Sequence, residues 1–247
     1  MKNNNINALK PYKKEYDYSY TLGAYATIEM LQGRPKLARA VYIHSNYSDK
    51  AAIEKLCRRN HVSCLYDDKV FGKVSPKENC YVLGVFDKYM EQLEKDKPHI
   101  VLVNPGDMGN LGTIIRMAAG FQICNLGIIT PAADIFNPKT IRASMGSLFR
   151  INYQLFETFE EYQSSYKKHH IFPFMLKAKV TLSPENCPRE DLFSLVFGNE
   201  AAGLEEAKYA TIGTSIKIPQ SDLVDSLNIS VAAGIGAFIF AHTNQLI

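Results

Sequence analysis

Polar side chains follow three strand-like segments of this chain, each at the point where the segment ends. In chain order they are Asn110 with Arg116, then Glu200, then Ser226 with Asn228. In a mostly parallel sheet, ligands collect at the loops that leave the carboxyl ends of the strands. A guanidinium, a carboxylate and several hydrogen-bonding groups gathered there could bind and orient a polar substrate. No loop is specific alone, and it is their common placement that predicts a site.

The first loop reads NPGDMGNLGTIIR, residues 104–116. Its glycines shape a turn, and Asn110 is placed to cap the following helix, whose apolar residues recur at helical spacing. Arg116 falls off this apolar stripe, so a solvent-facing arginine is the simple alternative to a functional one. The loop contains neither GxxxxGK(S/T) nor GxGxxG, and a Walker-type or dinucleotide phosphate loop is therefore not expected.

The second loop, GNEAAGL at 198–204, holds Glu200 in a glycine-bounded turn. A helix is expected from Ala201, so an acid at a helix start is the simple alternative to a site residue.

The third loop opens VDSLNISVAAGIGAFIFAH at 224–242, the most apolar stretch of the chain. Ser226 or Asp225 can cap this helix. Asn228 is expected inside the first turn, where asparagine is unfavourable because it competes with the backbone. The sequence therefore predicts a second use for Asn228, as part of a site.

Composition narrows the class of protein. Hydrophobic residues make up 46% of the chain and charged residues 21%, as in globular proteins with a full core. The run 231–241 is about half of the roughly 20 apolar residues that cross a bilayer. The sequence shows no secretory leader. We therefore expect a protein that has no membrane span and is located in the cytoplasm. The five cysteines are dispersed and expected to be reduced. Cys57, His61 and Cys64 lack a fourth ligand, so no metal is expected.

Basic charge is concentrated in the first part of the chain. Residues 1–97 hold 17 Lys and Arg against 12 Asp and Glu, whereas the remainder holds 11 against 13. The basic residues are interleaved with tyrosines, namely Tyr12, Tyr16, Tyr18 and Tyr20. This composition suits phosphate contacts and base stacking, although a solvated basic surface would have the same composition.

The hydrophobic pattern predicts two α/β domains, residues 1–97 and 98–247. In the first, strand-like runs alternate with helical patterns, as in a small α/β sandwich; the strands are expected at 40–43, 62–66 and 81–86, and the helices near 21–32, 49–59 and 68–74. The charged segment 87–98 fits a short helix or linker. In the second, the expected strands are 100–103, 126–129, 171–176, 195–197 and 215–218, with helices from Asn110, near 139–149, from Ala201 and at the C-terminal end. Such alternation implies a mostly parallel sheet.

Three ordered motifs resemble those of the SpoU/TrmH class of SPOUT RNA ribose 2′-O-methyltransferases. They are NxGxxxR at 110–116, GNExxGL at 198–204, and IP at 218–219 followed by SLNxSVA at 226–232. The segment IRASMGSLFR at 141–150 is similar to the one that lies between the first two motifs in that family. The resemblance covers about residues 98–245, and the first part of the chain resembles the L30e-like RNA-binding domain of many members.

The resemblance implies a SPOUT fold, in which a mostly parallel α/β sheet ends in a trefoil knot and follows a smaller L30e-like domain that binds the RNA substrate. It implies S-adenosylmethionine as cofactor, held largely by backbone groups, and a homodimer whose paired knots complete each site. By position, the cofactor-binding residues are Phe197, Gly198, Asn199, Gly203, Ile218 and Leu227.

The resemblance further implies a ribose 2′-hydroxyl, in ribosomal RNA, as methyl acceptor, with catalytic positions at Arg116, Asn110, Glu200, Ser226 and Asn228. Because a guanidinium is effectively always protonated, Arg116 is expected to bind the adjacent RNA phosphate and stabilise the emerging alkoxide rather than act as a base. Asn110 and Glu200 are expected to orient Arg116 and the loops, and Ser226 and Asn228 to shape the methionine end of the pocket. The departures from the family pattern, all at loop positions, are Ala201, Gln220 and Asp222.

Three alternatives stay open at this point. The substrate could be a transfer RNA, or the protein could be a non-catalytic RNA-binding or ribosome-assembly protein that retains the fold. A nucleotide-dependent enzyme of the doubly wound type is a third alternative, although it would lack its phosphate loop.

Overall fold

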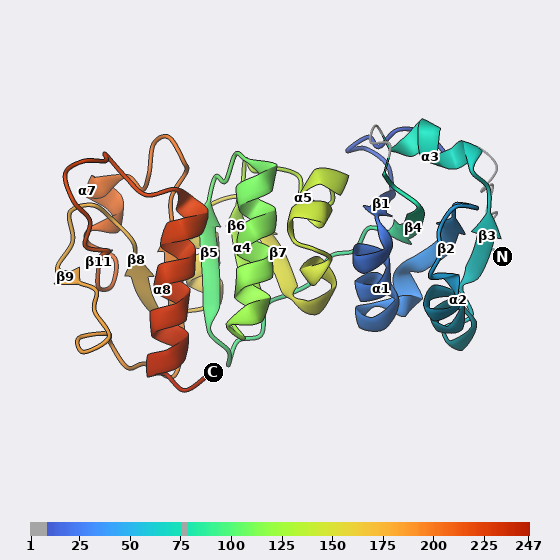
Figure 1. Ribbon diagram of the computed structural model, residues 1–247. Coiled ribbons are helices and arrows are strands. Elements are labelled where there is room, and N and C mark those ends of the chain that lie inside the picture. The colour runs from blue at the N-terminus through green and yellow to red at the C-terminus, as the bar shows by residue number, and fades with distance from the viewer. Residues whose placement is uncertain (1–8, 76–78) are drawn as a thin grey trace. The chain divides into compact units, whose positions relative to one another are not determined.

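The computed structural model describes residues 9–75 and 79–247, which form two compact units (Figure 1). The described residues of the first unit lie within Met1–Tyr89 and Asp134–Phe149, and the second unit comprises Met90–Ala133 and Arg150–Ile247. The change of unit at Tyr89 lies near the expected boundary after residue 97. The segment 134–149, however, packs with the first unit although the sequence places it in the second domain.

The first unit is built on a four-stranded sheet in the order β1-β4-β2-β3. β4 pairs antiparallel with β1 and β2, whereas β2 and β3 are parallel. The elements are β1 (Tyr18–Leu22), α1 (Ala24–Gly33), η1 (Pro35–Leu37), β2 (Ala38–Ile43), α2 (Lys50–Arg59), β3 (Ser63–Tyr66), α3 (Lys69–Val74) and β4 (Val82–Asp87). All strands and helices expected in this part are present. The structure adds one strand, β1, that the sequence does not predict. The likeness to an L30e domain stays a prediction.

The tyrosines around β1 serve the core of the first unit. Tyr20 is fully buried and is therefore not accessible to nucleic-acid bases. Tyr12 donates a hydrogen bond to the carboxylate of Asp134. The guanidinium of Arg39 lies 5.1 Å from the ring centroid of Tyr18. These contacts leave fewer aromatic and basic groups for RNA than the composition suggests.

The segment 134–149 supplies part of the core of the first unit. It contains α5 (Pro138–Ala143) and the start of η2 (Ser147–Arg150). The rings of Phe136 and Phe149 lie 6.1 Å and 5.0 Å from that of Phe86 in β4. Ser19 in β1 donates to the carbonyl of Phe136 at 2.5 Å. The first unit is therefore completed by a segment that follows two strands of the second unit in the chain.

The second unit is built on a parallel five-stranded sheet in the order β7-β6-β5-β10-β8. Its elements are β5 (His99–Val103), α4 (Met108–Gly120), β6 (Asn125–Ile129), β7 (Asn152–Phe156), α6 (Phe159–Ser165), β8 (His170–Pro173), β9 (Val180–Thr181), β10 (Phe193–Phe197), α7 (Glu206–Tyr209), β11 (Ile216–Lys217) and α8 (Ile229–Thr243). The expected α/β fold with a mostly parallel sheet is confirmed. β7 and α6 are not predicted by the sequence, and the trefoil knot stays a prediction.

Two buried layers hold the helices of the second unit to its sheet. α4 and α8 pack side by side (Figure 1), with Leu111 and Ala233 among their fully buried residues. Phe159 and Tyr162 of α6 belong to a separate buried cluster with Val101 of β5. Burying one such large side chain stabilises a fold by about 1.5–3 kcal/mol. Within the described residues, no helix is long and apolar enough to cross a bilayer.

A polar network is buried near the amino ends of β5 and β10. His99 is fully buried and hydrogen-bonds to the Tyr162 hydroxyl (2.9 Å) and to the Glu94 carbonyl (2.8 Å). The Tyr162 hydroxyl also pairs with Ser194 Oγ at 2.5 Å, which lies 3.0 Å from His169 Nδ1. Burial lowers the pKa of His99 to about 3, and the neighbouring His169 acts in the same direction. The network therefore holds His99 as a neutral imidazole.

Candidate active site

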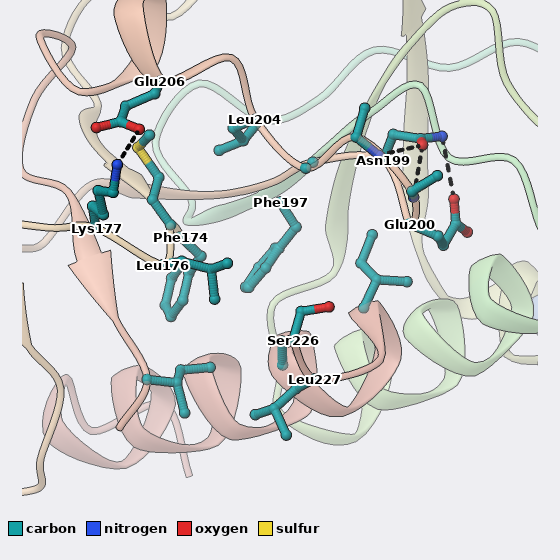
Figure 2. A pocket seen from close by; sticks show the side chains of 18 of the residues that line it. Phe174, Leu176, Lys177, Phe197, Asn199, Glu200, Leu204, Glu206, Ser226 and Leu227 are labelled. Carbon is teal, nitrogen blue, oxygen red and sulfur yellow. Dashed lines mark hydrogen bonds and ion pairs between the residues drawn. The ribbon is translucent and has the colours of Figure 1, made fainter. Parts of the chain in front are cut away.

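The loops after β8, β10 and β11 meet around a cavity in the second unit (Figure 2). β10 is parallel to both of its neighbours, β5 and β8, so the loops at their carboxyl ends reach the same edge of the sheet. The cavity has a volume of about 470 Å³. Its lining residues come from four segments, which lie within 174–177, 197–206, 218–220 and 226–232.

The turn at 198–204 is shaped by its two glycines and by Asn199. A Cβ on Gly198 would lie 2.1 Å from the carbonyl carbon of Gly203, whose φ of +67° also favours glycine. The Asn199 side-chain oxygen accepts hydrogen bonds from the N–H groups of Ala201 (2.9 Å) and Ala202 (3.2 Å). These bonds turn the backbone back on itself, so the helix expected from Ala201 is wrong. The short helix α7 begins only after the turn.

Glu200 ties the loop after β5 to the loop after β10. Its carboxylate accepts hydrogen bonds from the N–H groups of Gly106 (3.0 Å) and Asp107 (3.1 Å) and from the Asn110 amide (3.2 Å). Burial would raise the pKa of Glu200, but these hydrogen bonds outweigh burial and hold the pKa below its ordinary value. Glu200 therefore anchors another loop and does not cap a helix of its own segment.

Asp107, rather than Asn110, caps α4. The Asp107 side chain accepts a hydrogen bond from the backbone N–H of Asn110 at 2.8 Å. The expected capping role of Asn110 is therefore wrong. Its side chain instead donates to Glu200 and accepts from Asn228, at 3.1 Å.

Asn228 is the N-cap of α8 and also a member of the site. Its side-chain oxygen accepts from the N–H of Ser230 at 2.8 Å, while its amide nitrogen donates to Asn110. The cap expected at Ser226 or Asp225 is wrong because the helix begins further along the chain. Ser226 instead lines the cavity. The polar opening of this apolar helix thus serves both the helix and the site.

Arg116 is not brought to this network within one chain. From Asn110 to Arg116 the helix advances about 9 Å and turns by roughly 240° beyond one full turn. Arg116 is exposed, and within residues 9–75 and 79–247 it has no hydrogen bond or ion pair and does not line the cavity. Asn110 and Glu200 therefore hold the loops together but do not orient Arg116 in the same chain, contrary to the expectation.

The residues predicted to bind the cofactor all line the cavity. They are Phe197, Gly198, Asn199, Gly203, Ile218 and Leu227. Their binding role stays a prediction.

Other lining residues are missed by the sequence reasoning. The ring of Phe174 stacks on that of Phe197, with centroids 4.4 Å apart. It also packs against Gly236 of α8, where a Cβ would lie 2.6 Å from the ring. Lys177 and Glu206 line the cavity and form an ion pair at 3.3 Å (Figure 2). Two features of the sequence could have indicated Phe174 as a lining residue. It is an aromatic residue at the end of a strand-like run, and Gly236 inside an apolar helix leaves room for its ring.

The fold and the cavity define a class of protein. It is an α/β protein with a small-molecule site at the carboxyl edge of a parallel sheet, where a carboxylate and two amides hold the surrounding loops together. Residues 97–238 match the model of the SpoU rRNA Methylase family, and the chain belongs to this family.

Individual relatives have named activities. The chain is 34% identical over 131 residues to the 23S rRNA (guanosine(2553)-2′-O)-methyltransferase RlmP of Bacillus subtilis. The aligned region covers 52% of each chain. It is 32% identical over 144 residues to the 23S rRNA (adenosine(1067)-2′-O)-methyltransferase of Streptomyces laurentii. This second aligned region covers 56% of this chain and 51% of the relative. The chain spans about half the length of the curated relatives it matches. An AdoMet-bound rRNA methyltransferase from Sinorhizobium meliloti shares the fold over 94% of this chain and 88% of its own, with a TM-score of 0.77 at 22% identity.

Proposed function

We propose that this protein transfers a methyl group from S-adenosylmethionine to a ribose 2′-hydroxyl of ribosomal RNA. The observation that carries the proposal is the set of hydrogen bonds that Glu200, in the wall of the cavity, accepts from Gly106 in the loop after β5 and from Asn110 of the first motif. The two similar methyltransferases act, by name, on 2′-oxygens of 23S rRNA, and the similar structure from Sinorhizobium meliloti holds AdoMet. The proposal places this activity in the cytoplasm.

The cavity fits S-adenosylmethionine in size and in chemistry. Its volume of about 470 Å³ falls within the roughly 300–1,000 Å³ of small-molecule pockets. Phe174 and Phe197 give it an aromatic wall suited to adenine. Beside Gly203 no atom lies within 4 Å of where a Cβ would stand, so a ligand can approach the backbone there. When bound, S-adenosylmethionine supplies an electrophilic methyl group on its sulfonium.

The polar end of the cavity handles the RNA side of the reaction. With the cofactor bound, the ribose 2′-oxygen would accept the methyl group at this end, with the electrons of the carbon–sulfur bond passing to sulfur and the hydroxyl proton passing to water. Glu200 and Ser226 line this end, and the hydrogen bonds of Glu200 hold Asn110 beside it. Fixed groups of this kind can position the ribose and stabilise charge that develops on its oxygen.

Arg116 binds the RNA phosphate next to the target ribose from the exposed side of α4. Arg116→Lys keeps a cation but loses bidentate binding, so we expect turnover to fall about tenfold or more with the same dependence on pH. The measurement is the pH–rate profile of both proteins. A retained rate would contradict bidentate binding, and a displaced profile would favour arginine as the base.

The proposal includes a homodimer formed through α4 and α8. Val231 and Phe238 of α8 are 50% and 49% exposed, and the ring of Phe238 lies 5.7 Å from that of Phe121. A second copy would cover this apolar stripe and, as the family resemblance implies, complete each site. Light scattering should therefore give a dimer for the wild type and a monomer for Phe238→Arg. A monomeric wild type at working concentration would contradict the dimer.

RNA binding by the first unit is part of the same proposal. Residues 1–97 carry the basic excess of the chain. Arg39 does not contribute directly, because its guanidinium pairs with Asp17 at 2.7 Å and with Asp87 at 2.5 Å. Other lysines and arginines of this unit must then supply the phosphate contacts.

Two measurements test the function. Calorimetry should detect S-adenosylmethionine binding, and mapping of 2′-O-methylation in cells with and without the gene should show one ribosomal nucleotide that loses its methyl group. Loss at a transfer RNA nucleotide would replace the ribosomal substrate with a transfer RNA. Absence of binding at millimolar ligand would favour the non-catalytic RNA-binding protein.

A further inference from the structure

A chain of side-chain hydrogen bonds runs from the start of α8 to Glu200. The backbone N–H of Ser230 donates to Asn228 Oδ1 at 2.8 Å, and the Ser230 hydroxyl donates to the same oxygen at 2.6 Å. Asn228 Nδ2 donates to Asn110 Oδ1 at 3.1 Å, and Asn110 Nδ2 donates to Glu200 Oε1 at 3.2 Å. Residues of all three motifs are thus linked in series.

The direction of this chain is fixed at both ends. A backbone N–H can only donate, so the Asn228 atom that faces Ser230 must be the oxygen. An ionised carboxylate can only accept, so the Asn110 atom that faces Glu200 must be the nitrogen. Each amide is therefore held in one orientation, and neither can turn over without placing two donors or two acceptors against each other.

This fixed direction decides what the two amides can offer to a ligand. Both amide oxygens already accept hydrogen bonds. Each amide nitrogen carries two hydrogens, of which one is used in the chain. Within residues 9–75 and 79–247, the second N–H of each amide has no acceptor, Asn228 is exposed and Asn110 is partly exposed. The pair therefore presents two N–H donors.

Neither amide lines the cavity itself, but each lies beside residues that do. Glu200, which Asn110 contacts, lines the cavity at the end away from the Lys177–Glu206 ion pair (Figure 2). Ser226, two residues before Asn228, lines it as well. A group of RNA bound at this end would meet the two amides.

We infer that Asn110 and Asn228 form a donor pair for an anionic oxygen of the RNA, and that Ser230 is a positioning residue that fixes the Asn228 amide. The inference rests on the proposed function. The oxygen is that of the phosphate beside the target ribose or the 2′-oxygen as it loses its proton; both are acceptors with negative charge, which donors fixed in advance bind best.

Asn228→Asp is the sharpest variant, because aspartate keeps the cap of α8 while removing both N–H donors. Asn228→Ser also caps the helix and removes the amide without adding charge. Gln245→Glu is the matched control, an amide-to-carboxylate change at an exposed residue near the end of the chain. Thermal unfolding of every variant checks that the fold is kept.

We expect Asn228→Asp and Asn228→Ser to lose about 10²- to 10³-fold in activity, as for the removal of an oxyanion donor, with unchanged affinity for S-adenosylmethionine. A loss in kcat assigns the 2′-oxygen, because its charge develops only in the transition state. A rise in the KM for RNA with kcat retained assigns the phosphate. Ser230→Ala should lose part of this activity and Ser230→Thr should restore it. Wild-type kinetics in Asn228→Ser would overturn the inference.

A second readout does not depend on methyl transfer. In ¹⁵N-labelled protein, the side-chain NH₂ signals of Asn110 and Asn228 are assigned by their loss in Asn110→Ser and Asn228→Ser. They should shift when inorganic phosphate or a ribo-oligonucleotide is added at constant ionic strength. No shift with either probe would overturn the donor pair, even if methylation is observed. A shift in a protein that methylates no RNA would instead reject the proposed function and retain the donor pair.

Discussion

Glu200→Gln tests whether one carboxylate holds the loop after β5 against the cavity. The carboxylate accepts from four donors, of which two are the backbone N–H groups of Gly106 and Asp107 and two are the side-chain amides of Asn110 and Asn199. Glutamine offers a single oxygen, so the N–H of Gly106 or that of Asp107 would face an NH₂ group and lose its acceptor. Loss of a hydrogen bond to a charged group costs about 1.5–3 kcal/mol. A cost of about 2 kcal/mol corresponds to roughly 30-fold in an equilibrium constant.

We therefore expect the free energy of unfolding to fall by about 2 kcal/mol in Glu200→Gln. Turnover should fall at least as steeply as this factor of roughly 30, because the freed loop leads directly into the first turn of α4, which carries Asn110. Urea unfolding and methyl transfer are measured on the same preparations. Glu205→Gln serves as the control, since the Glu205 side chain is exposed and makes no capping hydrogen bond.

The dependence on pH gives this prediction a sign. The folded state lowers the pKa of Glu200 below its ordinary 4.5, so the folded state binds fewer protons than the unfolded state near that pH. The stability that the carboxylate provides is present above pH 4.5 and is lost as pH falls through the lower folded value. The difference between wild type and Glu200→Gln should be constant near neutral pH and shrink in acid. Equal stability at neutral pH, or a difference that persists undiminished in acid, would refute the reasoning.

Three further predictions concern other parts of the chain. Gly198→Ala should weaken S-adenosylmethionine binding about 10- to 100-fold in calorimetry, because its Cβ would overlap Gly203; unchanged affinity would contradict this. The pKa of His99, lowered to about 3, means that the unfolded state binds the extra proton, so urea unfolding should show a loss of about 2 kcal/mol from pH 7 to pH 5, and less in His99→Gln; a flat profile would argue against it. A fragment of residues 1–97 should lack a cooperative thermal transition by circular dichroism and gain one when 134–149 is added; a cooperative fragment alone would be inconsistent with a shared core.

Half of the site was predictable because its residues follow neighbouring strands of a parallel sheet. The rule that ligands gather at the carboxyl ends of such strands places Asn110, after β5, beside Glu200, after β10, without any knowledge of side-chain contacts. Ser226 follows β11, which pairs with β9 in a separate two-stranded sheet, so the rule does not place it there. The polar start of an apolar helix likewise predicts a second use for Asn228. The exact capping residues were not predictable. α4 is capped by Asp107 instead of Asn110, and α8 is capped by Asn228 instead of Ser226 or Asp225.

The features that the sequence did not predict depend on side-chain contacts and on packing between distant segments. β1 reads YSYTL, and its buried polar residues follow no apolar alternation; Ser19 and Thr21 are accommodated by hydrogen bonds to Phe136 and Thr27. The helix expected from Ala201 is prevented by Asn199 Oδ1, which competes for the same backbone N–H groups. Packing of 134–149 with the first unit has no local signal, because sequence periodicity reports which face of an element is buried but not its partner.

The core of the first unit is built from two stretches that are far apart in the sequence. This separation determines when the first unit can fold during translation. The ribosome completes β4 well before it reaches Phe136 and Phe149, whose rings complete the packing around Phe86. A nascent chain that ends after β4 therefore leaves an apolar gap open to solvent, a state in which chaperone binding and aggregation compete with folding. The N-terminal part can reach its final packing only after β5, α4 and β6 have been synthesised, so folding of the first unit must wait for the first strands of the second.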